Sequence, residues 1–148
     1  MKTIEGIRRS GVAIGPERSI REAACVMEES GVGALVILDV DRIVGIVTDR
    51  DLVRRGLAKG LDLEARVDAV MSAPVVTIDA NADLRDSFAL FRENALRRLV
   101  VTRDRHFVGM ITADDLLVNL AADLSDLTRP ITAEILFAHR DVPVVAVR

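Results

Sequence analysis

The sequence has few of the features that mark secreted, membrane or metal-binding proteins. The single cysteine, Cys25, cannot form an internal disulfide, and the two histidines, His106 and His139, lack the spacing of metal ligands. No apolar run approaches the roughly 18 residues of a membrane-spanning helix. The first residues lack the apolar stretch of a secretory signal. We therefore expect a soluble, cytoplasmic protein that does not contact a membrane.

Aromatic residues are scarce, and basic residues are not in excess. There is no Trp, no Tyr and only four Phe, and 20 basic residues face 23 acidic ones. Residues 1–74 carry 11 basic and 12 acidic side chains, and residues 75–148 carry 9 and 11. Binding to a phosphate backbone needs a basic surface, and binding to single strands uses aromatic platforms. The composition therefore argues against a nucleic-acid partner.

Catalytic motifs are absent as well. The sequence contains no G-x-S-x-G, no Walker A motif and no H-E-x-x-H. Asp114 and Asp115 are adjacent, and adjacent residues on a helix point apart, so they do not form an acid–base pair. Cys25 has no histidine near it in the sequence, and we expect a buried, inert thiol. We predict that the protein is not an enzyme.

The sequence does contain an internal repeat. Shifted by 64 positions, residues 12–54 overlay residues 76–118 without a gap, and 11 of the 43 positions are identical. The clearest shared stretch is GIVTDRD at 45–51, which returns as GMITADD at 109–115. Such a match indicates a duplicated unit.

Both copies predict a short strand, a helix, two strands and a second helix. The apolar runs of the later strands are continuous, which is typical of strands buried on both faces. The strands are expected at 12–14, 34–38 and 42–48 in the first copy, and at 75–78, 98–101 and 106–112 in the second.

The helices are predicted from their caps and apolar spacing. Ser19 and Glu22 have the S-x-x-E spacing of a capping box, and Asp83 is the cap of the equivalent helix. The expected apolar faces are Ile20, Ala23, Ala24 and Met27, then Leu84, Ser87, Phe88 and Phe91. The closing helices are expected at 49–55 and 113–127, the latter with an apolar stripe of Leu117, Leu120, Ala121 and Leu124, and Pro130 is expected to break it.

We predict three parts: a first repeat at 1–60, a second repeat at 61–127 and a tail at 128–148. The linker between the repeats is expected to hold a helical turn near Val67–Met71. The apolar end of the tail, VPVVAVR, has three open interpretations: an edge strand, a contact with a partner, or disorder.

The duplicated β-α-β-β-α unit, with G-h-h-T-x-x-D entering each final helix, resembles a tandem pair of CBS domains over about residues 1–127. The stretches VMSAPVVTI and LRRLVV also resemble the second repeat of that family. The resemblance implies an α+β fold in which the two repeats pack by their sheets about a pseudo-twofold axis. It further implies a homodimer, and clefts between the repeats that bind adenine nucleotides or adenosyl compounds.

The threonine and aspartate of each motif, Thr48 with Asp51 and Thr112 with Asp115, have two interpretations. At the N-cap and N3 positions they cap the helix that follows. From the same positions, a carboxylate can accept hydrogen bonds from the vicinal diol of a ribose. The motif's glycine lets another backbone or a ligand approach the strand closely. Capping and binding are compatible, so both interpretations stay open.

Arg98 stands immediately before the leucine of its strand, where nucleotide-binding members of the family place a basic residue toward phosphate. The alternative is a solvated pair with Arg97 at a strand edge. The equivalent residue of the first copy is Ala34, so the first cleft lacks this charge, and Arg50 is the weaker candidate there. The predicted ligand-binding residues are Thr48, Asp51, Arg98, Thr112, Asp115, Ile14, Ala34 and Ile78.

The leading hypothesis is a regulatory module that senses AMP, ADP, ATP or another adenosyl compound in the inter-repeat cleft. It requires no cofactor or metal, and it transmits binding to an unidentified protein partner. The alternative is a ligand-free module for protein–protein interaction, in which threonine and aspartate only cap helices and the apolar tail docks the partner.

Overall fold

The computed structural model describes residues 2–138, with side chains described as far as Ile131. The chain divides into two units, Met1–Ala113 and Asp114–Arg148. The first unit holds the strands of both repeats, and the second begins one residue into the last helix, so each unit is treated by itself.

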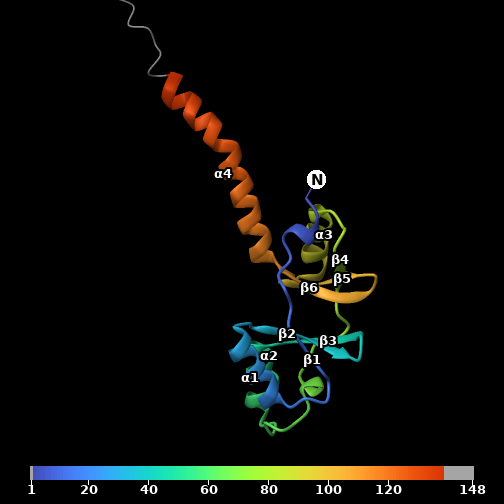
Figure 1. Cartoon of the computed structure of the whole chain (residues 1–148). Coiled ribbons are helices and arrows are strands. Elements are labelled where there is room, and N and C mark those ends of the chain that lie inside the picture. Colours follow the sequence, from blue (N-terminus) through green and yellow to red (C-terminus); the bar gives the residue numbers. More distant parts are fainter. Residues whose placement is uncertain (1, 139–148) are drawn as a thin grey trace, which may run out of the picture. The chain divides into compact units, whose positions relative to one another are not determined.

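The predicted order of elements is confirmed, and most strand ends lie within two residues of expectation (Figure 1). The first repeat consists of β1 (Ala13–Ile14), α1 (Ile20–Ser30), β2 (Ala34–Asp39), β3 (Arg42–Thr48) and α2 (Asp49–Asp51). The second consists of β4 (Thr77–Asp79), α3 (Leu84–Asn94), β5 (Arg98–Arg103) and β6 (His106–Thr112), and α4 (Ala113–Ala138) follows.

Each repeat forms its own three-stranded sheet, in the orders β1-β2-β3 and β4-β5-β6. In both, the first strand is parallel to the central strand and the third is antiparallel to it. Both central strands carry one irregularity, after Ile37 in β2 and after Val101 in β5. These two positions are 64 residues apart, so the duplication extends to the register of the strands.

The two sheets pack against each other. Successive side chains of a strand point to opposite faces, so β2 contributes to two cores. Its Leu35 and Ile37 pack under α1, whereas Ala34 and Val36 meet Val100 of the other sheet. The predicted α+β fold of two sheet-packed repeats is confirmed.

The segment before each repeat pairs with the other repeat. The Ile4 N–H donates to the Ala82 carbonyl (3.1 Å), and Arg9 exchanges two hydrogen bonds with Met110 of β6 (2.9 and 3.0 Å). The linker between the repeats pairs in the same way with β3 of the first repeat. The N-terminal strap (residues 2–12) and the linker strap (residues 63–76) therefore tie the repeats together.

The glycine of each G-h-h-T-x-x-D motif accommodates one of these straps. A Cβ on Gly109 would lie 2.4 Å from the Arg9 carbonyl oxygen. A Cβ on Gly45 would lie 2.3 Å from the Met71 sulfur and 3.1 Å from the Ser72 carbonyl oxygen. At position 109 a side chain would therefore collide with the backbone of a strap, whereas at position 45 it would first meet the flexible Met71 side chain.

The predicted caps of α1 and α3 are confirmed. The Ser19 hydroxyl accepts from the Glu22 N–H (3.0 Å), and the Glu22 carboxylate accepts from the Ser19 N–H (3.0 Å). Asp83 accepts from the Arg85 N–H (2.9 Å).

The expected apolar face of α1 is partly wrong, because Ala24 and Cys25 are exposed. The buried face consists of Ile20, Ala23 and Met27. Cys25 lies two residues beyond Ala23, about 200° around the helix, and therefore points away from that face. The expectation of a buried thiol is corrected accordingly.

The closing helix of the first repeat departs from the regular helix predicted at 49–55. Its α-helical part ends at Asp51, a π-helical turn covers Leu52–Gly56, and a 3₁₀ turn covers Leu57–Lys59. The helical turn expected in the linker is found at Val67–Ala69.

The expected end of α4 is wrong, because the helix passes through Pro130 and continues to Ala138. The fixed φ of proline is close to the helical value, so the helix loses one N–H bond and crowds the carbonyl four residues back without ending. The apolar stripe predicted on this helix is exposed: Leu117, Leu120 and Leu124 are 63%, 43% and 61% exposed. The stretch VPVVAVR lies outside the described residues.

Candidate functional site

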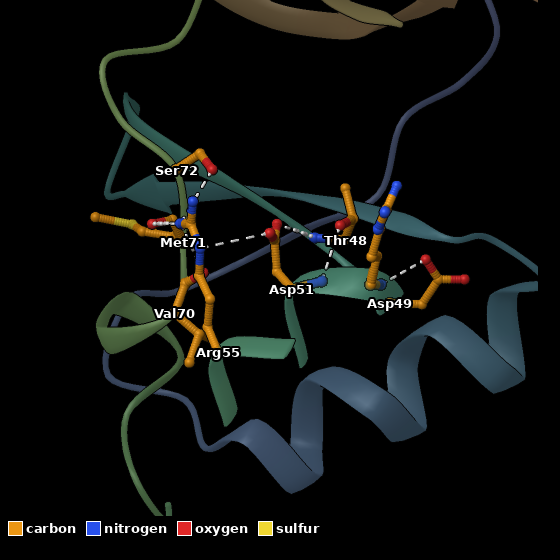
Figure 2. Close-up of polar contacts among 8 residues, drawn as sticks. Thr48, Asp49, Asp51, Arg55, Val70, Met71 and Ser72 are labelled. Carbon is orange, nitrogen blue, oxygen red and sulfur yellow. Dashed lines mark hydrogen bonds and ion pairs between the residues drawn. The ribbon is translucent and has the colours of Figure 1, made fainter. Parts of the chain in front are cut away.

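The motif of the first repeat forms a complete capping box at the start of α2 (Figure 2). The Thr48 hydroxyl accepts from the Asp51 N–H at 3.1 Å. The Oδ2 atom of Asp51 accepts from the Thr48 N–H at 2.9 Å. The capping interpretation is therefore confirmed for this repeat, and it occupies one carboxylate oxygen of Asp51.

The other carboxylate oxygen of Asp51 faces Arg55, one helical turn further on. Arg55 Nε lies 3.8 Å from Asp51 Oδ1, and the Asp51 side chain is 18% exposed. The same guanidinium donates through Nη1 to the linker strap: to the Met71 carbonyl (3.1 Å), the Ser72 hydroxyl (3.2 Å) and the Val70 carbonyl (3.5 Å) (Figure 2). Asp51 thus belongs to a cluster that helps hold the linker strap.

In the second repeat, the motif borders a cavity of about 210 Å³. Arg98 of β5 is the register partner of Thr112 at the end of β6, so both side chains come to the same edge of the sheet. Three parts of the chain line the cavity: the N-terminal strap, the α1–β2 loop with the first residue of β2, and the β5–β6 pair. The lining residues are Arg9, Ser10, Gly11, Val12, Gly31, Val32, Gly33, Ala34, Arg98, Met110 and Thr112.

This lining combines two arginines with apolar and backbone surface. Arg9 and Arg98 give it positive charge, and Val12, Val32 and Met110 give it apolar walls. Ligand sites for drug-sized molecules usually span ~300–1,000 Å³, so a nucleotide seated here extends beyond the cavity.

Sequence reasoning missed Arg9. It precedes the first strand, in a segment that the repeat alignment does not cover. Only the crossing of the N-terminal strap to β6 brings Arg9 to the cavity.

The other predicted site residues do not lie together in one site. Ala34 lines the cavity described above. Ile14 lines a separate cavity of about 620 Å³, and Ile78 is buried in β4. Asp115 is buried in the first turn of α4, and Arg50 is exposed.

No group of three potential metal-ligating side chains occurs among the residues that the structure describes. Within residues 2–138, no helix has both the length and the apolar composition needed to cross a membrane.

Comparisons with known proteins agree with this architecture. The model of the CBS domain family matches residues 4–58 and 67–122. The chain is 32% identical over 120 residues to CBS domain-containing protein YhcV of Bacillus subtilis, covering 80% of this chain and 86% of that protein.

Two solved structures are also similar. The crystal structure of Hypoxic Response Protein I with two coordinated zinc ions has a TM-score of 0.70 and 34% identity, covering 78% of this chain and 97% of that chain. The hexameric CBS-CP12 protein from bloom-forming cyanobacteria has a TM-score of 0.69 and 25% identity, covering 79% and 70%. With two family matches on two repeats of the same topology, this chain belongs to the CBS domain family, whose tandem pairs are regulatory ligand-binding modules.

Proposed function

We propose that the protein senses an adenosine-containing ligand at the cavity bordered by Thr112, and that binding regulates a partner without catalysis. The observation that carries the proposal is that Arg98 and Thr112 are register partners and that both line this cavity. A charged donor and a polar group beside apolar walls suit a ligand with a phosphate, a ribose and a flat base.

The two arginines are the phosphate-binding groups in this proposal. Guanidinium groups bind phosphate oxygens in pairs of parallel hydrogen bonds. Arg98 comes from β5 and Arg9 from the N-terminal strap, so a phosphate between them links the two repeats. Such a link provides a means for ligand occupancy to alter how the straps hold the repeats together.

The ribose-binding group at the cavity is Thr112, and Asp115 follows it three residues later in the same sequence motif. A carboxylate accepts both hydrogen bonds of a vicinal diol and repels phosphate. Met110, Val12 and Val32 supply apolar surface for the base. AMP, ADP, ATP and adenosyl compounds all present these groups.

The cleft of the first repeat binds such a ligand more weakly in this proposal. Ala34 stands at the position equivalent to Arg98 and pairs with Thr48 in the sheet. The Asp51 carboxylate already faces the Thr48 N–H and Arg55. A ribose there competes with an existing cation and gains no arginine at position 34.

Calorimetric titration with adenosine, AMP and ATP tests the proposal, together with thermal unfolding. A ligand at about 100 times its dissociation constant adds ~2.7 kcal/mol to the free energy of unfolding. Thr112→Val removes the hydroxyl from the cavity and should weaken binding, whereas Thr48→Val removes the matched hydroxyl of the first repeat and should not. If no adenine compound binds, or if both variants behave alike, the assignment of the site is wrong.

A second candidate function is a ligand-free interaction module. It is favoured by the complete capping box at Thr48 and Asp51, which needs no ligand, and by the exposed apolar side chains of α4. An unchanged melting temperature with every adenine compound, combined with capture of a protein partner, supports this function. In either case we expect the protein to act in the cytoplasm as a homodimer.

A further inference from the structure

Helix α4 presents a row of large apolar side chains to solvent. Among the side chains that the structure describes, eleven large apolar ones are exposed, and six of them belong to this helix. Five of the six form one row along it: Leu117, Leu120, Leu124, Leu127 and Ile131, with exposed fractions of 63%, 43%, 61%, 65% and 50%. A contiguous exposed apolar surface of this kind marks an interaction site.

The spacing of the row indicates that its partner is another helix. The intervals alternate between three and four residues, which is the heptad pattern of a coiled coil, with Leu117, Leu124 and Ile131 at a positions and Leu120 and Leu127 at d positions. The flanking e and g positions from residue 121 onward are small or polar: Ala121, Asp123, Thr128 and Pro130. An a/d-only stripe is narrower than the face that a helix turns to a globular core. The row therefore fits one other helix with the same period.

We propose that this heptad row (Leu117, Leu120, Leu124, Leu127 and Ile131) packs in parallel against α4 of a second copy of the chain. The partner needs the same 3.5-residue period, and a second copy supplies it. In a parallel pair, Asp123 at g faces the uncharged Thr128 at e of the other helix, so no like charges meet there. An antiparallel pair brings Asp123 toward the Asp123 of its partner, which disfavours it electrostatically.

This inference names the interface of the homodimer proposed above and does not depend on any ligand. All measurements can be made without nucleotide, so failure of the interface and failure of the ligand site are separate outcomes. Because Cys25 is exposed, a reducing buffer is needed to exclude adventitious disulfide dimers.

Sedimentation velocity on the full chain at micromolar concentration tests the interface. We expect the wild type to be a dimer and Leu124→Glu to raise its dissociation constant by more than ~100-fold, because a charge enters the seam. Ala122→Glu places the same charge on the opposite face of the same helix and should leave the dimer intact. Far-UV circular dichroism checks that both variants remain folded.

Mixing charge variants tests the contact directly. In a parallel pair Leu124 faces Leu124, so Leu124→Glu mixed with Leu124→Lys should restore the dimer that each variant alone has lost. Restoration with Leu120→Lys instead overturns the parallel arrangement. A monomeric wild type, or a Leu124→Glu variant as dimeric as Ala122→Glu, overturns the interface altogether.

Discussion

The two repeats pair their strands in the same order and register, and each is crossed by the strap that leads into the other. Against this common backbone, a few side chains differ. Arg98 of the second repeat corresponds to Ala34 of the first, and Arg9 of the N-terminal strap corresponds to Ala73 of the linker strap. The two repeats therefore share strand order and register, whereas the charged side chains around the two motifs differ.

One helical turn after the motif's aspartate, it is the first repeat that has an arginine and the second that lacks one. The first repeat has Arg55, which faces Asp51 and holds the linker strap. The second repeat has Asn119 at the equivalent position. In the first repeat, arginine therefore serves the structure, and in the second repeat it lines a cavity. Duplication preserved the fold and left the charged positions free to diverge.

The largest expected effect concerns the glycines that admit the straps. Gly109→Ala should lower the free energy of unfolding by about 3 kcal/mol and Gly45→Ala by about 1–2 kcal/mol, as in overpacked interiors. The Cβ of residue 109 meets the Arg9 backbone, whereas the nearest atom to residue 45 is a flexible methionine sulfur. Urea unfolding of both variants measures the difference, and equal losses would show that the two straps are equally rigid.

Next in size is the loss of a carboxylate. Asp115→Asn should weaken adenosine and AMP binding by about 1.5–3 kcal/mol, the range for a hydrogen bond to a charged group. Asp51→Asn should leave affinity unchanged and cost only a few tenths to ~1 kcal/mol of folding stability, because its role is at a helix N-terminus. Calorimetry and thermal unfolding separate the two effects. If Asp115→Asn loses stability alone, this carboxylate also serves only its helix.

A smaller effect is expected from the arginine at the cavity. Arg98→Ala should weaken AMP binding by about 1.5 kcal/mol, the lower end for a charged hydrogen bond, because Arg9 remains. Adenosine has no phosphate, so its affinity should not change, and the two ligands should then bind more alike. Ala34→Arg is the reciprocal variant, and a gain of AMP affinity there would show that one side chain sets the difference. If Arg98→Ala weakens the binding of AMP and adenosine equally, Arg98 has a structural role and does not bind phosphate.

The smallest effect concerns an ion pair that only one strap has. Glu5 lies 2.7 Å from both Arg8 and Arg103, and the hydrogen bond from Arg8, followed by that from Arg103, lowers the pKa of Glu5 below its ordinary 4.5. A lowered pKa stabilises the folded protein fully above the ordinary value, and this contribution is lost as the pH falls through the lowered one. The linker strap has Ala69 at the equivalent position.

Glu5→Gln should therefore lower the melting temperature slightly at neutral pH, and the difference from wild type should shrink as the solution is acidified below pH 4.5. Glu29→Gln makes the same chemical change on the exposed surface of α1 and provides the control. A difference that stays constant down to the acid limit would show that this ion pair contributes nothing.

Local chemistry made much of the fold predictable. The capping box at Ser19, the cap at Asp83 and the continuous apolar runs of β2 and β5 are encoded within a few residues, so they were predicted correctly. The 64-residue repeat was visible because both copies keep the same pattern of apolar residues. The capping role of Thr48 and Asp51 followed from the same local spacing.

The arrangement of the cavity required the tertiary structure. Arg9 reaches it only because the N-terminal strap crosses to β6, and no local pattern encodes a pairing between residues about a hundred positions apart. The continuation of α4 through Pro130 and the exposure of its leucines were also missed, because periodicity shows that a helix has an apolar face but not what covers it. Sequence determined which segments form helices and strands. The packing of one repeat against the straps of the other decided which side chains share a site, since that depends on contacts distant in the chain.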